Sequence, residues 1–183
     1  VAEVLDPRHV ELVASYVDML RIGTRNMSNT ALLREVGRQP LPVQLKRGRA
    51  ATVEEWIDAA EYIYNEGNHG IVLVERGVRG FDPSARNTLD ITAVPLAKRM
   101  THLPVMVDPS HSAGRSDLVP ALARAAVAAG ADGLLVDVHP RPAEALVDGR
   151  QALTKEEFVS LARELRALAA ALGRPAAQLG GDS

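Results

Sequence analysis

Short apolar runs alternate along the chain with longer stretches in which apolar residues recur at helical spacing. An apolar run of four to eight residues bounded by polar residues is typical of a buried strand, whereas apolar residues at every third or fourth position indicate an amphipathic helix. The pattern predicts strands at residues 1–5, 19–22, 43–45, 71–74, 105–107 and 133–136. It predicts helices at residues 7–16, 29–37, 53–66, 88–99, 115–129 and 155–172.

Six strand–helix units in succession predict an α/β fold with a parallel sheet. Polar or charged residues follow five consecutive strands, whereas a doubly wound sheet concentrates its site at one switch point. The pattern therefore favours a (β/α)8 TIM barrel, in which many strand ends contribute to one site. We predict about six of the eight βα units, within a partial TIM-barrel domain at 1–174 that is followed by a disordered tail at 175–183.

Three cations, Arg25, Lys46 and Arg76, each lie just after a predicted strand. Because alternate residues of a strand face the same side, Gln44 shares a side with Lys46, and Arg21 shares a side with Arg25. One such cation is more often a surface residue. Three on adjacent strand ends require an anion, for which a phosphate or a carboxylate is suitable.

A histidine and two carboxylates follow the last two predicted strands. His111 comes after the strand at 105–107, Asp137 comes after the strand at 133–136, and Asp148 lies in a turn further on. Neighbouring parallel strands place their C-terminal ends side by side, so the three side chains can converge. One histidine with two carboxylates suits a divalent metal, and a buried structural cluster is the alternative. Together with the cations, this set predicts an enzyme that acts on a phosphorylated or carboxylated metabolite with metal help.

Composition narrows the partners and the location. The net charge is -2 and no basic stripe is visible, which disfavours nucleic acid. No apolar run approaches the roughly 20 residues that span a bilayer, which disfavours a membrane. The chain contains no cysteine and no visible signal peptide, which fits a cytoplasmic location.

Five blocks of sequence carry a resemblance to a known family. They are IGTRN at 22–26, LKRG at 45–48, VERGVRGFDPSARNTLDITAVP at 74–95, HLPVMVDPSHSAGR at 102–115 and GADGLLVDVHPRPAEALVDGRQAL at 130–153. The chain resembles the 3-deoxy-D-arabino-heptulosonate 7-phosphate (DAHP) synthases, in the short type I-beta branch. That branch is close to the 3-deoxy-D-manno-octulosonate 8-phosphate (KDO8P) synthases.

The resemblance implies a metal-assisted, aldol-type condensation of phosphoenolpyruvate with erythrose 4-phosphate. The products are DAHP and phosphate, in the first step of the shikimate pathway to aromatic amino acids. It implies a divalent metal, Mn²⁺ or similar, as cofactor. The implied substrates are phosphoenolpyruvate and an aldose phosphate, and the implied oligomeric state is a homo-oligomer. The implied substrate-binding residues are Thr24, Arg25, Lys46 and Arg76. The implied catalytic residues are Lys46 and His111, and the implied metal ligands are His111, Asp137 and Asp148.

The chain departs from the family pattern at several points. The family's first strand, which carries a cysteine ligand, and its Lys-Pro-Arg-Thr-Ser block are absent from this sequence. Asp137 stands where a glutamate is usual, which removes about 1.5 Å of reach. Arg21 replaces a glutamine on the inward side and requires a carboxylate partner, for which Glu3 is the candidate. Arg49 and Gly80 fill positions where the family commonly has an apolar residue and a threonine.

Six units alone are expected to leave two open sheet edges and an exposed apolar barrel interior, so we hypothesise a fragment of a longer product. Three functional hypotheses remain: an active DAHP synthase, a related synthase that uses another aldose phosphate, as KDO8P synthases do, or a non-catalytic relative.

Overall fold

The computed structural model describes residues 1–174, and the predicted tail at 175–183 lies outside the described residues. A sheet of six parallel strands organises the described part, with the strands paired in chain order from first to last. The strands are β1 Ala2–Glu3, β2 Leu20–Ile22, β3 Val43–Lys46, β4 Ile71–Glu75, β5 Val105–Val107 and β6 Gly133–Leu134. All six predicted strands are therefore present.

Helices connect the strands. They are α1 Val10–Ala14, α2 Thr30–Gly37, α3 Val53–Tyr64, α4 Ala93–Met100, α5 Pro109–Ala113, α6 Val119–Ala128 and α7 Lys155–Ala171. Short 3-10 turns are η1 Pro7–His9, η2 Thr24–Asn26, η3 Ser116–Leu118, η4 Pro142–Glu144 and η5 Gly149–Gln151. Capping boxes start α3 and α7, because a threonine and a glutamate three residues later satisfy each other's backbone amides at both places.

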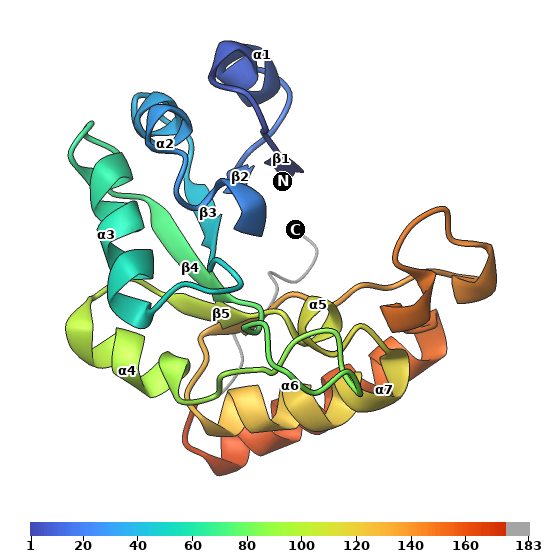
Figure 1. Cartoon of the computed structure of the whole chain (residues 1–183). Helices are drawn as coiled ribbons and strands as arrows, with labels where there is room; N and C mark the ends of the chain where they lie inside the picture. Colours follow the sequence, from blue (N-terminus) through green and yellow to red (C-terminus); the bar gives the residue numbers. More distant parts are fainter. Residues whose placement is uncertain (175–183) are drawn as a thin grey trace, which may run out of the picture.

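The strands form an arc, and α1, α2, α3, α4 and α6 follow one another along its outer side (Figure 1). Strands that pair in chain order and in one direction, without reversal, are arranged as in a barrel rather than in a doubly wound sheet. The strands β1 and β6 are the two edges of the described sheet. This arrangement agrees with the predicted partial barrel.

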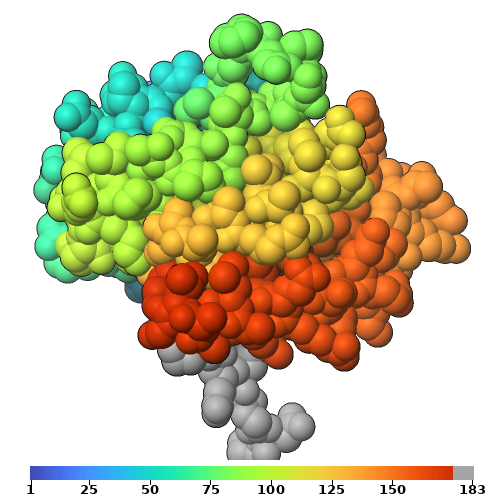
Figure 2. Space-filling model, turned by 90° about the horizontal axis from the view of Figure 1, so that it is seen from below, coloured from blue at the N-terminus to red at the C-terminus, as the bar shows by residue number. Residues whose placement is uncertain are grey.

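The main hydrophobic core lies between the sheet and its helices. The outward side chains of the strands are nearly or fully buried there; they include Leu20, Ile22, Val43, Leu45, Ile71, Leu73, Val105 and Val107. Trp56 of α3 is fully buried among them, and its Nε1 donates to the carbonyl oxygen of Leu45 at 3.2 Å. The helices α6 and α7 pack together through a second, smaller core, and they lie side by side in Figure 2.

The inner face of the sheet is polar on β2 and β3, where Arg21, Gln44 and Lys46 lie. It is apolar on β4 and β5, where Val72, Val74 and Met106 lie in register with them, so the expected apolar interior holds only for β4 and β5. Arg21 donates from Nε to Oε1 of Gln44 at 2.7 Å, and the two residues are direct neighbours in the β2–β3 register. The expected Arg21–Glu3 ion pair is absent from the described residues. Glu3 extends toward Gly23 instead, where an added Cβ would lie 2.1 Å from its Oε1.

No helix in the described part of the chain has the length and apolar character that crossing a bilayer requires.

Asp132, just before β6, ties three segments together. Its Oδ2 accepts from the backbone amide of Val105 at 2.9 Å, and its Oδ1 pairs with Lys98 and with Arg174. Burial raises the pKa of Asp132, but the hydrogen bonds from Lys98 and from the Val105 amide outweigh it, so the pKa lies below its ordinary value of 3.8.

Replacing the carboxylate of Asp132 is expected to lower stability only at pH values at which the carboxylate is ionised. Because the folded-state pKa is lowered, the contribution is present above about pH 4 and is lost as the pH falls through the folded-state pKa. We expect Asp132→Asn to lower the melting temperature by about 1–3 °C at pH 7, and the difference to vanish toward pH 2. Thermal unfolding across this range checks it, with Asp18→Asn, at an exposed position, as the control.

Candidate functional site

Most of the predicted site residues line one cavity of about 220 Å³ beyond the C-terminal ends of the strands, which we call the mouth. The predicted residues that line it are Thr24, Arg25, Lys46, Arg76, His111 and Asp148. Glu3, Gly23, Arg49 and Arg86 complete the lining. Asp137 does not line the mouth, but its Oδ2 lies 3.6 Å from Nδ1 of His111. The structure thus brings together side chains that are far apart in the sequence.

Asp108 connects the cationic and the imidazole parts of the mouth. Its carboxylate is fully buried, and its Oδ2 accepts from Nζ of Lys46 at 2.7 Å. Burial raises the pKa of Asp108, but the hydrogen bond with His111 and the charge of Lys46 outweigh it and lower the pKa to about 2. The ionised carboxylate therefore holds Nζ of Lys46 in place.

The same carboxylate orients His111. Oδ1 of Asp108 accepts from the backbone amide of His111 at 2.9 Å and so caps α5, while Oδ2 lies 2.9 Å from the ring Nδ1. Asp108 therefore both caps the helix and orients the histidine. With Nδ1 engaged by Asp108, Nε2 of His111 faces Asp148, whose Oδ2 is 3.6 Å away.

Arg86 and Gln151 hold the two predicted carboxylate ligands. Nη1 of Arg86 donates to Oδ1 of Asp148 at 3.0 Å and to Oε1 of Gln151 at 3.1 Å. Nε2 of Gln151 in turn donates to Oδ2 of Asp137 at 2.6 Å. One guanidinium thus fixes both carboxylates, one directly and one through an amide.

The turn that presents Asp148 is set by local geometry. Asp148 has a left-handed backbone with φ of 53°, which aspartate tolerates better than most residues. An added Cβ at the next residue, Gly149, would lie 2.3 Å from the carbonyl oxygen of Pro142, so only glycine fits there. This close approach fixes the path of the chain from Asp148 to Gln151.

The donor set suits a divalent ion, because one imidazole and two carboxylates are common ligands of such ions. The two carboxylates, however, approach different nitrogens of His111, with Asp137 near Nδ1 and Asp148 near Nε2. Within residues 1–174, no group of three or more histidine, aspartate or glutamate side chains has the geometry of a ready metal site. Metal ligation by these three residues stays a prediction.

Arg76 lies at the buried floor of the mouth. It is 4% exposed, and its Nη2 donates to the carbonyl oxygen of His111 at 3.2 Å. Its Nη1 is buried and has no hydrogen-bond partner in the described part of the chain. Burial lowers the pKa of Arg76, and the charges of Arg86 and Arg49 add to this against the opposing effect of Asp108. A buried guanidinium with an unused donor is suited to an anionic ligand.

A second ionic network lies behind the mouth and pins its strand ends. Nη1 of Arg47 donates to Oε2 of Glu75 at 2.8 Å and to Oδ2 of Asp90 at 2.9 Å. Arg47 and Glu75 are the chain neighbours of Lys46 and Arg76, and alternate residues of a strand face opposite sides. The outward ion pair therefore fixes the two strand ends from which the inward cations project.

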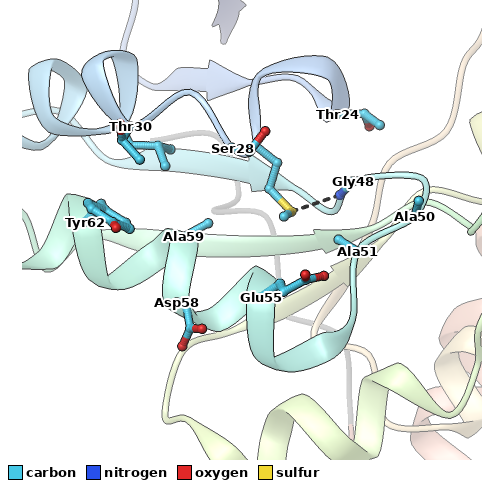
Figure 3. A pocket seen from close by; sticks show the side chains of 12 residues that line it. Thr24, Ser28, Thr30, Gly48, Ala50, Ala51, Glu55, Asp58, Ala59 and Tyr62 are labelled. Atoms are coloured by element: carbon cyan, nitrogen blue, oxygen red, sulfur yellow. Dashed lines mark hydrogen bonds between the residues drawn. The ribbon is translucent and has the colours of Figure 1, made fainter.

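A larger cavity, of about 420 Å³, lies between α2 and α3 and is drawn in Figure 3. Of the predicted site residues, only Thr24 reaches it, and most of its exposed lining is apolar. We place the site in the smaller mouth, because the three cations and two of the predicted metal ligands, His111 and Asp148, line it.

Sequence reasoning missed Arg86 and Gln151 as site residues, although both lie inside the blocks that carry the family resemblance. Neither follows a strand directly, so strand-end spacing gave no signal for them. Arg86 belongs to the irregular segment between β4 and α4, and Gln151 ends the turn η5.

Comparison with known proteins shows which proteins this chain is related to. A family model described as the DAHP synthetase I family matches residues 1–173. The chain is 51% identical over 173 residues to phospho-2-dehydro-3-deoxyheptonate aldolase of Thermotoga maritima, which is 94% of this chain and 51% of that protein. It is 33% identical to 2-dehydro-3-deoxyphosphooctonate aldolase of Syntrophotalea carbinolica, over 92% of this chain and 64% of that protein.

Solved structures agree. A crystal structure of the Thermotoga maritima DAHP synthase superposes with a TM-score of 0.93 at 51% identity, over 94% of this chain and 51% of that one. A truncated form of the same synthase gives a TM-score of 0.93 at 50% identity, over 95% of this chain and 66% of that one. The predicted fold class is confirmed, and the chain spans about half the length of the full-length relative. The chain belongs to the DAHP synthetase I family.

Proposed function

We propose that the protein condenses phosphoenolpyruvate with erythrose 4-phosphate to give DAHP and phosphate. The observation that carries this proposal is the mouth itself, where buried Lys46 and Arg76 lie beside His111 in one cavity. A small, multiply charged anion suits such a floor, since desolvated cations bind phosphate and carboxylate strongly. The 51% identity to a Thermotoga maritima DAHP synthase, against 33% to an octulosonate-type relative, favours erythrose 4-phosphate as the second substrate.

The cations have distinct roles in this proposal. Arg76 binds the anionic groups of phosphoenolpyruvate through its unused Nη1. Arg25, beside Thr24, binds the same groups from the exposed edge of the mouth. Lys46, which Asp108 holds in place, donates a hydrogen bond to the substrate and is the candidate for proton transfer. Holding both reactants in one cavity lowers the entropic part of the barrier.

His111, Asp137 and Asp148 are the residues that would hold a divalent ion such as Mn²⁺. The ion, when bound, supplies a Lewis acid that polarises the aldehyde. Asp108 prepares His111 for this role by engaging Nδ1, which leaves Nε2 facing Asp148. A homo-oligomer and a cytoplasmic location are further parts of the proposal and stay predictions.

Phosphate release tests the reaction. We expect the 183-residue chain with Mn²⁺ and phosphoenolpyruvate to release phosphate when erythrose 4-phosphate is added, and at least about tenfold more slowly with a five-carbon aldose phosphate. Preference for the five-carbon substrate would indicate that the protein is a synthase of the octulosonate type instead. Failure to bind phosphoenolpyruvate and any divalent ion tighter than millimolar would favour a non-catalytic relative.

Arg76→Met is expected to weaken phosphoenolpyruvate binding by about 10–100-fold, because it removes charged hydrogen bonds from the floor. Calorimetric titration measures the affinity independently of turnover. Arg79→Met is the matched control, because Arg79 is exposed in the loop after β4. It should leave the affinity for phosphoenolpyruvate unchanged.

A further inference from the structure

The mouth holds its cations on two levels. Lys46 and Arg76 form the floor, with 6% and 4% of their surface exposed. Arg25, Arg49 and Arg86 line the same cavity but are exposed, so they form its rim. A ligand on the floor and a ligand above it would therefore meet different cations.

The charges of both levels are only partly compensated. On the floor, Lys46 pairs with Asp108 at 2.7 Å, and on the rim Arg86 pairs with Asp148 at 3.0 Å. Among residues 1–174, the structure pairs none of Arg25, Arg49 and Arg76 with a carboxylate within ion-pair distance. A cavity of about 220 Å³ that holds such uncompensated guanidinium groups is set up for more than one anionic group.

Arg49 stands on a segment whose backbone is fixed. The backbone amide of Arg79 donates to the carbonyl oxygen of Arg49 at 2.7 Å, which ties the segment to the loop after β4. The amide of Gly48 lies 3.0 Å from Sδ of Met27, a contact drawn in Figure 3. Nε of Arg47 donates to the carbonyl oxygen of Ala51 at 3.0 Å on the other side. Arg49 thus extends from an anchored rim, close enough to Arg76 for its charge to lower the pKa of that group.

We propose that Arg49 is an anion-binding residue of the rim, and that it receives the phosphate group of the second substrate while the floor cations hold the first. The inference rests on the proposed function, because it places two phosphorylated substrates in one mouth. The floor cations are buried, so the substrate that they hold lies deeper in the mouth than the phosphate at the rim.

Binding of inorganic phosphate to the loaded protein tests this inference without turnover. The 183-residue chain is saturated with phosphoenolpyruvate in the absence of an aldose phosphate, and phosphate is titrated by calorimetry at constant ionic strength. We expect phosphate to bind beside phosphoenolpyruvate, and Arg49→Gln to weaken this binding about tenfold or more. Arg79→Gln removes the same charge from the adjoining loop and should change the affinity less than twofold.

The possible outcomes separate the two proposals. If phosphoenolpyruvate binds but phosphate does not bind beside it, or if Arg49→Gln and Arg79→Gln have equal effects, the rim site is wrong and the proposed function stands. If phosphate binding depends on Arg49 but phosphoenolpyruvate does not bind at all, the rim binds anions but the proposed reaction is wrong. Because the Arg49 side chain is exposed and makes no ion pair within residues 1–174, the variant is expected to fold normally.

Discussion

Replacing Arg47 by methionine is expected to lower the free energy of unfolding by about 3–5 kcal/mol. The side chain of Arg47 is 6% exposed, and the side chain of Glu75 that it contacts is fully buried. Removing one member of a buried ion pair leaves the other without compensation, and the desolvation cost of that charge then falls on the folded state. Asp90 loses the same partner but is partly exposed, so water replaces part of its contact.

Chemical denaturation at two pH values checks the size and the cause of this loss. Burial raises the pKa of Glu75 even with Arg47 present, and removal of the cation raises it further. A carboxyl group with a raised folded-state pKa stabilises the fold at low pH and loses that contribution as the pH rises through the folded-state pKa. The deficit of Arg47→Met should therefore be smaller at pH 5 than at pH 7.

Arg115→Met provides the control, because Arg115 pairs with Asp117 at 2.7 Å but both side chains are about half exposed. That variant should lose far less stability than Arg47→Met, because water solvates both groups. A loss below about 1 kcal/mol for Arg47→Met at pH 7 would show that the network behind the mouth is not a main support of the strand ends.

The periodicity of the chain was sufficient to locate every strand, because each is a short apolar run whose outward residues face the helices. The helix bounds were less predictable. The predicted helix at 88–99 begins at Ala93, since Thr88 bonds to Val78 across the loop and Asp90 is drawn to Arg47. The short helix α5 was missed, because it is started by the cap that Asp108 forms rather than by an apolar pattern.

Part of the candidate site could likewise be predicted from sequence, and part could not. Lys46, Arg76 and His111 could be found from sequence, because each follows a strand and parallel strands end together. The partner of Arg21 could not be found from sequence. The choice between Glu3 and Gln44 depends on how the side chains lie across the sheet, which the hydrophobic pattern does not reveal. Loop residues that reach into the mouth from a distance in the sequence have no periodic signal at all.

Gln151 is the loop residue for which the largest effect on metal binding is expected. It is 2% exposed, and its amide is the donor that holds Oδ2 of Asp137 at 2.6 Å. Hydrogen bonds to ligating carboxylates commonly change metal affinity by about 10–100-fold. Asp137 depends strongly on this bond, because its side chain is short and an unguided carboxylate samples other rotamers.

Gln151→Leu keeps the buried volume approximately constant but removes both polar contacts, and we expect it to weaken Mn²⁺ binding by about 10–100-fold. Calorimetry or electron paramagnetic resonance of free Mn²⁺ measures this without any turnover. Gln39→Leu makes the same change before β3, at the opposite end of the strands, and should leave the affinity unchanged. Equal Mn²⁺ affinities for Gln151→Leu and the unaltered chain would mean that Asp137 is not a ligand, because a ligand that loses its only side-chain donor in residues 1–174 cannot keep its orientation at no cost.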